Sequence, residues 1–253
     1  MLLAIDAGNS NVVIGISDGG RWLGTTRIET TSALGAAQIA SALEQLLCVH
    51  GLRPVHGAVI GCVVACLKQP LIDACRVHLD CPLVDAACAA EFGIRIAYQR
   101  PSELGIDRIA NAVAVRRQTN CDAVVVDLGT ATKVDFVSRE GVFVGGIIAP
   151  GVMTAFDGLR SRAPRLRNFE IQSPTRTLGQ STRECLQSGA IVGHAAMIDG
   201  LIDRIADETH TRPAVYATGG LAQMVAPHSK KITSVDPNLT LDGLRLIFER
   251  SLP

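Results

Sequence analysis

The sequence predicts an α/β fold in which one structural unit occurs twice. Two stretches carry the prediction, "AIDAGNSN" at 4–11 and "AVVVDLGTAT" at 123–132. In each, an apolar run typical of a buried strand ends in an aspartate, and a short turn of small residues leads into a second apolar run. A third strand-like segment and helix-like sequence then follow in both halves. This repeated order of elements predicts an internal duplication.

The first half begins with three strand-like segments, at residues 2–6, 11–17 and 21–29. A "SDGG" turn separates the last two of them. Residues 33–50 have helical periodicity, and "GAVIGCVV" at 57–64 predicts a buried strand. Residues 102–118 predict a helix that ends in two arginines, where positive charge is favourable. We expect this helix to connect the two halves.

The second half repeats the pattern with three strands, at residues 122–129, 132–138 and 142–148. An apolar helix is expected at 188–202, and the stretch at 214–226 predicts a strand that runs into glycines and then a helix. No Pro-rich or low-complexity linker separates the halves. We therefore expect an N-terminal domain at 1–117 and a C-terminal domain at 118–253.

Composition limits the partners of the protein. The chain has 253 residues, 47% of them hydrophobic, and Lys plus Arg equals Asp plus Glu at 24 each. It therefore lacks the net charge that would attract nucleic acid or an anionic membrane over long range. The "MLLAIDAG" start has no basic segment before its first carboxylate, which argues against a signal peptide. We expect a cytoplasmic protein with a small-molecule ligand, no nucleic acid and no membrane.

Eight cysteines occur in the chain, and most lie within apolar runs. No CxxC pair is present, and the pair with the closest spacing, Cys62 and Cys66, has no pair of histidines nearby. A chain of this length can bury a core without disulfides. We expect reduced, buried thiols and no zinc site.

The two aspartate turns have the composition of a phosphate-binding site. Gly8 and Gly129 allow close approach to a backbone whose N–H groups, with neighbouring hydroxyls and amides, can hold phosphate oxygens. Asp6 and Asp127 are placed to hold a cation, directly or through water. A third turn, "TGG" at 218–220, has no acid and is expected to admit the nucleoside. Neither the Walker A pattern nor the Rossmann fingerprint is present.

A single aspartate-glycine turn is more often an ordinary hairpin with an Asx-type hydrogen bond. Its occurrence at matched positions in both halves favours the phosphate site. The layout resembles that of the acetate and sugar kinase, Hsp70 and actin superfamily, and within it the type III pantothenate kinases. The motifs that carry this resemblance run along nearly the whole chain: "DAGNSN", "Y..P..LGIDR", "DLGTAT", "GGIIAPG", "GQST", "TGGLA" and "VDPNLTLDGL".

The resemblance implies two duplicated actin-like (ribonuclease H-like) domains, each a mixed sheet flanked by helices, with a cleft between them. It implies ATP-dependent phosphorylation of pantothenate at its primary hydroxyl, the first step of coenzyme A biosynthesis. It also implies a homodimer that requires Mg²⁺ and a monovalent cation, K⁺ or NH₄⁺. Two rival functions stay open, a kinase of the same superfamily for another small alcohol and a nucleotide-binding regulator without turnover.

The resemblance assigns ATP to the first turn, whose residues are Asp6, Ala7, Gly8, Asn9, Ser10, Asn11, Val12 and Val13, and to Thr130 in the second turn. Their place in the other small-residue turns adds Thr132, Gly219 and Gly220. Asp127 corresponds to the ligand of the monovalent cation. Asp6 is expected to hold Mg²⁺, directly or through water.

For pantothenate, the resemblance assigns Tyr98, Gly105, Ile106, Asp107, Arg108 and Thr182, with Asp107 as the general base. A carboxylate suffices for that role, because phosphoryl transfer mostly requires an oriented alcohol whose proton is accepted late. Each assignment has a purely structural alternative. Asp107 could be a surface acid paired with Arg108, Thr182 a helix N-cap, and Tyr98 a half-buried strand aromatic.

Lys133 stands where the family usually has a threonine. Its ammonium could reach Asp127 and take the place of the monovalent ion. Alternatively, Lys133 and Asp135 share a face of a strand and form an exposed pair that leaves the ion site untouched. Strand periodicity alone does not decide between the two.

Overall fold

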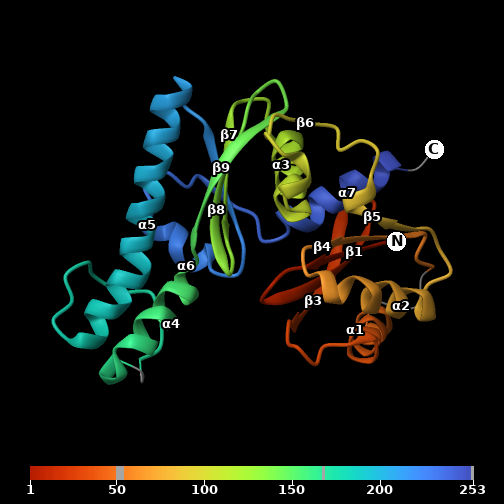
Figure 1. Cartoon of the computed structure of the whole chain (residues 1–253), viewed down its shortest axis with the longest axis horizontal. Coiled ribbons are helices and arrows are strands. Elements are labelled where there is room, and N and C mark those ends of the chain that lie inside the picture. The colour runs from red at the N-terminus through yellow and green to blue at the C-terminus, as the bar shows by residue number, and fades with distance from the viewer. Residues whose placement is uncertain (50–53, 167–168, 252–253) are drawn as a thin grey trace. The chain divides into compact units, whose positions relative to one another are not determined.

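The computed structural model describes residues 1–49, 54–166 and 169–251 (Figure 1). It divides the chain into two compact units, and each is described by itself. The first unit comprises Met1–Arg117 and the chain from Asn238 onward, and the second comprises Gln118–Pro237.

The first unit is built on a mixed sheet with the strand order β3-β2-β1-β4-β5. Its strands are β1 (Leu2–Ala7), β2 (Asn11–Asp18), β3 (Arg21–Glu29), β4 (Gly57–Cys62) and β5 (Leu83–Asp85). The hairpins β1–β2 and β2–β3 are antiparallel, whereas β4 is parallel to both β1 and β5. The first four strands confirm the strand predictions for this half. A further short strand, β6 (Arg95–Ile96), precedes the segment that carries Tyr98.

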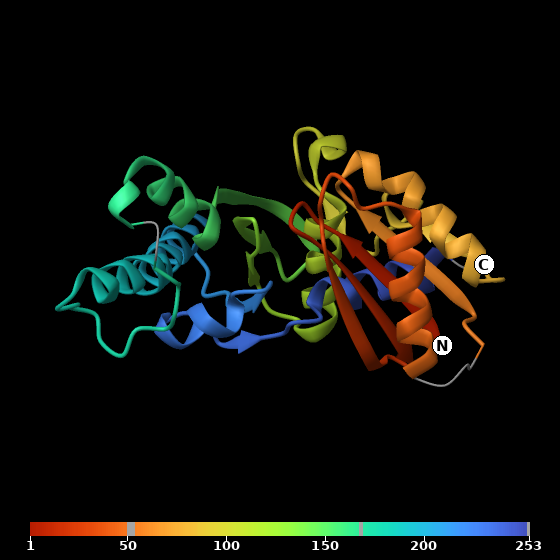
Figure 2. The same ribbon diagram turned by 90° about the horizontal axis from the view of Figure 1, so that it is seen from below.

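Helices cover both faces of this sheet. Helices α1 (Ala36–Val49) and α2 (Lys68–His78) contribute to the same apolar cluster as β1 and β2, and Figure 2 shows α1 in front of the strands. The core of that cluster includes Leu3, Ile5, Ile14, Ile39, Leu43 and Leu71. Helix α3 (Ile106–Gln118) matches the connecting helix that the sequence predicts. Helix α2 was not predicted.

The last helix, α7 (Leu239–Ser251), corrects the expected domain division, which placed it in the C-terminal domain. It lies beside β1 and β4 in the first unit (Figure 1). Glycines on the strands make room for it. A Cβ built on Gly61 would lie 2.7 Å from Leu244, and one on Gly15 would lie 2.8 Å from Leu241. Close packing against bare backbone therefore holds α7 on this sheet.

The second unit contains strands in the order β11-β10-β7-β8-β9. Their bounds are β7 (Ala123–Leu128), β8 (Ala131–Val137), β9 (Val142–Pro150), β10 (Ala214–Thr218) and β11 (Ser234–Val235). Strands β7, β8 and β9 are antiparallel neighbours, and β10 runs parallel to β7. The burial pattern of the first seven residues of β2 is the same as that of the seven residues of β8. This matched pattern is what an internal duplication predicts.

The α-helices among the described residues of the second unit are α4 (Val152–Arg162), α5 (Thr182–Thr209) and α6 (Ala222–Val225). Helix α5 extends the predicted helix at both ends, and its residues Ile191 and Ile198 are fully buried against β7 and β10 residues such as Val124 and Val215. By length and composition α5 is long and apolar enough to cross a membrane, and one of its faces contributes to the core of this unit. The part of the chain that the structure describes also has five short 3₁₀ segments, Ala65–Leu67, Ala86–Cys88, Pro101–Glu103, Pro164–Leu166 and Ala226–His228.

The cysteines are free, as expected, but most are not buried. Only Cys75 is buried, and burial raises the pKa of its thiol to about 12. Five others are exposed, because the apolar runs that contain them also form helix surfaces and loops. Among the residues described, no group of three His, Cys, Asp or Glu side chains is arranged to hold a metal.

Candidate functional site

The first aspartate turn connects β1 to β2 and is held by hydrogen bonds on two sides. The Gly8 N–H donates to the Asn11 carbonyl at 2.9 Å, which closes the turn. From the end of β3, the Thr30 hydroxyl donates to the Gly8 carbonyl at 2.8 Å and the Thr30 N–H to the Ser10 carbonyl at 2.9 Å. Asn9 and Ser10 remain exposed. The turn is therefore a fixed, solvent-facing loop of small residues, as a phosphate site requires.

Asp6 is the penultimate residue of β1 and is half-buried. Its partner across the β1–β2 pair is Val13, which carries no charge. Mg²⁺ is commonly bound through one or two carboxylates together with substrate phosphates. A single aspartate beside a phosphate turn fits such an ion.

The second aspartate turn connects β7 to β8 and is held by the start of α4. The Gly129 N–H donates to the Ala131 carbonyl at 3.1 Å. The Thr130 carbonyl accepts from the Gly151 N–H at 3.1 Å and from the Thr154 hydroxyl at 2.6 Å. A Cβ built on Gly151 would lie 2.5 Å from the Thr130 oxygen, so the close approach needs glycine.

Asp127 faces a lysine across its strand pair, whereas Asp6 faces a valine. Lys133 stands opposite Asp127 in the β7–β8 pair, and its Nζ lies 2.9 Å from Asp127 Oδ2. The two side chains are only 19% and 14% exposed. Asp135 is 2% exposed, which rules out the exposed Lys133–Asp135 pair. The carboxylate that the resemblance assigns to a monovalent cation thus lies beside an ammonium from the chain itself.

The glycine turn after β10 lies against the second aspartate turn. Gly219 has a φ of 93°, which favours glycine, and a Cβ there would lie 2.7 Å from Asp127 Oδ1. The Leu221 N–H donates to the Leu128 carbonyl at 3.4 Å. Two of the three turns assigned to ATP, including Gly219 and Gly220, therefore form one surface in the second unit.

The residues assigned to pantothenate in the first unit also lie together. Asp107 is half-buried in the first turn of α3, and its Oδ1 accepts from the Arg108 N–H at 2.9 Å. Gly105 lies directly beside that carboxylate, and Ile106 is buried beneath it in the same turn. Arg108 is 4% exposed, with its guanidinium 5.7 Å from the centre of the Tyr98 ring. Tyr98 is half-buried as expected but lies outside any strand.

Thr182 lies in the second unit as the first residue of α5. The N-cap is its neighbour Ser181, whose Oγ accepts from the Glu184 N–H at 3.2 Å. The alternative that made Thr182 the cap is therefore wrong. Either hydroxyl can cap a helix, so the sequence does not distinguish them.

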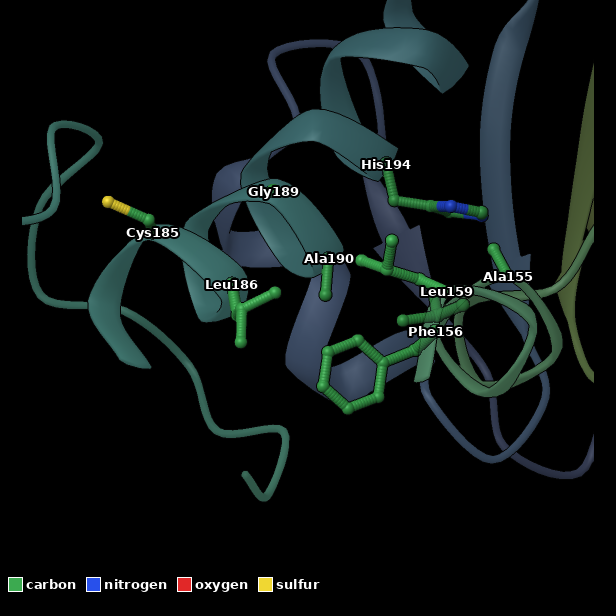
Figure 3. A pocket seen from close by; sticks show the side chains of 9 residues that line it. Ala155, Phe156, Leu159, Cys185, Leu186, Gly189, Ala190 and His194 are labelled. Atoms are coloured by element: carbon green, nitrogen blue, oxygen red, sulfur yellow. The ribbon is translucent and has the colours of Figure 1, made fainter. Parts of the chain in front are cut away.

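A cavity of about 280 Å³ lies between α4 and α5, and Figure 3 shows its side chains. Its lining is apolar apart from His194 and Cys185 and consists of Val152, Ala155, Phe156, Leu159, Cys185, Leu186, Gly189, Ala190 and His194. His194 lies in none of the motifs that the sequence singles out. Yet His194 Nε2 lies 2.7 Å from the hydroxyl of Thr132, a residue assigned to ATP. Burial lowers the pKa of His194, so its imidazole is neutral at neutral pH.

Two mixed sheets flanked by helices, each with an aspartate turn between its first two strands, define an actin-like, ribonuclease H-like α/β protein. Solved structures agree with this class. A Campylobacter jejuni protein assigned to the Baf family of transcriptional activators has a TM-score of 0.61 at 23% identity, covering 98% of both chains. ADP-bound MreB5 of Spiroplasma citri has a TM-score of 0.54 at 10% identity, covering 98% of this chain and 96% of its own.

Sequence comparison identifies the family. The family model for type III pantothenate kinase matches residues 2–204. The type III pantothenate kinase of Gluconobacter oxydans is 40% identical over 99% of this chain and 94% of its own. That of Frankia alni is 39% identical over the full length of both. The chain belongs to the type III pantothenate kinase family.

Proposed function

We propose that this protein transfers the γ-phosphoryl group of ATP to the primary hydroxyl of pantothenate. The product is 4′-phosphopantothenate, and the reaction is the first step of coenzyme A biosynthesis. The observation that carries the proposal is the cluster of Tyr98, Gly105, Asp107 and Arg108 in a chain of this family. An anionic substrate with a free alcohol suits this mixture of a cation and a carboxylate.

In the proposed reaction the pantothenate hydroxyl oxygen bonds to the γ-phosphorus as the bond to the β-γ bridging oxygen breaks. The alcohol proton passes to the Asp107 carboxylate, and ADP leaves. The Arg108 N–H donates to Asp107 Oδ1 at 2.9 Å, and this hydrogen bond orients the carboxylate. Tyr98 and Arg108 orient the substrate, and we also assign Thr182 of the second unit to pantothenate.

We assign ATP to the first turn, Asp6 to Val13, and to Thr130, Gly219 and Gly220 in the second unit. Thr132, which its place in the sequence assigned to the same site, is fully buried and supports the turn from inside the unit. Asp6 would hold Mg²⁺, which neutralises phosphate charge when bound. At Asp127 we propose that the Lys133 ammonium takes the place of the monovalent cation. Its distance of 2.9 Å from Oδ2 supports this assignment.

We further propose a cytoplasmic homodimer. Large apolar side chains on neighbouring elements β9 and α4 support an interface between copies, since Ile148 is 61% exposed and Val144, Met153 and Leu159 are each more than 40% exposed. A second copy would cover them. Sedimentation of the full chain that shows an active monomer would contradict the dimer.

The direct test is incubation of the purified chain with ATP, Mg²⁺ and pantothenate, followed by mass detection of phosphopantothenate. Formation of that product with one ADP per turnover is the expected result. ATP-dependent phosphorylation of other small alcohols but not of pantothenate would favour the related kinase. Nucleotide binding without phosphorylation of any alcohol would favour the regulator.

Replacement of the general base gives a sharper test. Asp107→Asn should bind ATP and fold like the wild type but lower kcat by about two to four orders of magnitude, the usual contribution of a positioned base. Asp73→Asn on the exposed face of α2 is a matched control and should leave kcat unchanged. An unchanged kcat for Asp107→Asn would reject it as the base.

A further inference from the structure

Two helices form hydrogen bonds to the second aspartate turn and to the start of the strand that follows it. Helix α4 holds the Thr130 carbonyl through the Gly151 N–H and the Thr154 hydroxyl, at 3.1 and 2.6 Å. Helix α5 holds Thr132 through His194, at 2.7 Å. Thr130 lies in this turn, and Thr132 is the second residue of β8, which follows it. Thr130 is therefore held from the start of α4, and Thr132 is held from α5.

Because a cavity separates α4 from α5, the hydrogen bonds that these helices make to Thr130 and Thr132 are important for the position of the turn. Val152, Ala155, Phe156 and Leu159 of α4 face α5 residues across about 280 Å³ of unfilled space (Figure 3). Side-chain packing along this stretch therefore leaves the spacing of α4 and α5 loosely fixed. The hydrogen bonds to the turn do not depend on that packing.

Through Thr132, His194 also contacts β8, the strand that carries Lys133. Thr132 is fully buried and His194 is 9% exposed, so an unpaired Thr132 hydroxyl would be costly. Side chains alternate along a strand, so Thr132 points inward while Lys133 points to the face of Asp127. An inward anchor at Thr132 thus fixes the position of β8 and of the Lys133 ammonium beside Asp127.

We propose that His194 and Thr154 are positioning residues for the ATP phosphates, acting through Thr132 and Thr130. The inference rests on the proposed kinase function. Neutral His194 offers one donor and one acceptor nitrogen, so either tautomer can pair with the Thr132 hydroxyl. Thr154 completes the turn from the other side. Loss of either anchor lets the turn shift away from the phosphates.

The test compares kinetic constants of paired variants. His194→Leu removes the hydrogen bond at similar size, and His194→Gln restores a polar partner. Thr154→Val and Thr154→Ser form the second pair, at an exposed position where folding is not at risk. We expect His194→Leu and Thr154→Val to raise the KM for ATP about tenfold while the KM for pantothenate stays unchanged. The Gln and Ser variants should recover most of the loss.

A matched control is His228→Gln. His228 Nε2 lies 2.7 Å from the Ser173 hydroxyl, the same type of pair in the same unit but exposed and bonded to a different loop. Its KM values should equal those of the wild type. Equal increases in both KM values for His194→Leu and Thr154→Val, without rescue, would mean a merely structural role and overturn the proposal.

Titration with ADP in the absence of pantothenate separates this proposal from the proposed function. Weaker ADP binding by His194→Leu and Thr154→Val supports the positioning role even if the wild type makes no phosphopantothenate. Unchanged ADP binding by both variants overturns it even if the wild type is an active pantothenate kinase.

Discussion

The two aspartate turns have the same strand arrangement and differ in the charge of the residue that faces each aspartate. Both join the first two antiparallel strands of a sheet, and both place an aspartate at the end of the first strand. Across the strand pair, however, Asp6 faces Val13, whereas Asp127 faces Lys133 at 2.9 Å. The same position in the duplicated hairpin is neutral in one unit and cationic in the other.

This difference indicates that the two aspartates took on different roles after duplication. Asp6, with an uncharged residue opposite it, suits a cation that arrives with ATP. Asp127 has its positive charge built into the chain. The supports differ as well, because Thr30 of β3 holds the first turn and the start of α4 holds the second. Each turn can therefore be altered separately.

Among changes at the two aspartate turns, the largest expected effect comes from the first turn. Asp6→Asn should lower kcat/KM for ATP by about two to three orders of magnitude, because the neutral amide is a poorer ligand for Mg²⁺. Added Mg²⁺ should recover part of the loss. Titration of activity against Mg²⁺ checks this. A Mg²⁺ dependence identical to that of the wild type would remove Asp6 from the metal site.

Methyl groups added at the two turns should have unequal effects. Gly151→Ala places a Cβ 2.5 Å from the Thr130 oxygen, so the second turn must move, and we expect a loss of about 1–3 kcal/mol in the free energy of unfolding. Gly8→Ala places its Cβ 3.3 Å from the Asn11 oxygen and should cost less. Urea unfolding of both variants measures the difference. A Gly8→Ala variant as unstable as Gly151→Ala would contradict the packing account.

The smallest expected effect concerns pH. Burial lowers the pKa of His194 below its ordinary value of 6.5, so below about pH 6.5 the unfolded chain binds a proton that the folded chain does not. The free energy of unfolding should therefore fall as pH drops below 6.5. In His194→Gln this fall should be shallower, as measured by urea unfolding between pH 5 and 8. Identical slopes would show that His194 is not the group responsible.

Local sequence patterns sufficed to predict both hairpins and the aspartate turns, because strands and tight turns depend on residues that are neighbours in the sequence. The place of α7 could not be predicted in this way. It depends on Gly15 and Gly61 leaving space on a sheet far away in the sequence. The bond between Thr132 and His194 likewise joins residues with no local relation. The Lys133–Asp127 pair was one of two open alternatives until the position of Asp135 in the core became known.

The most direct test of the difference between the turns is phosphopantothenate formation in buffer free of potassium and ammonium. It is measured for the wild type and for Lys133→Thr, with and without added K⁺. If the Lys133 ammonium supplies the charge at Asp127, the wild type is fully active without the ion and Lys133→Thr becomes active only when K⁺ is added. A wild type that itself requires K⁺ would contradict the account.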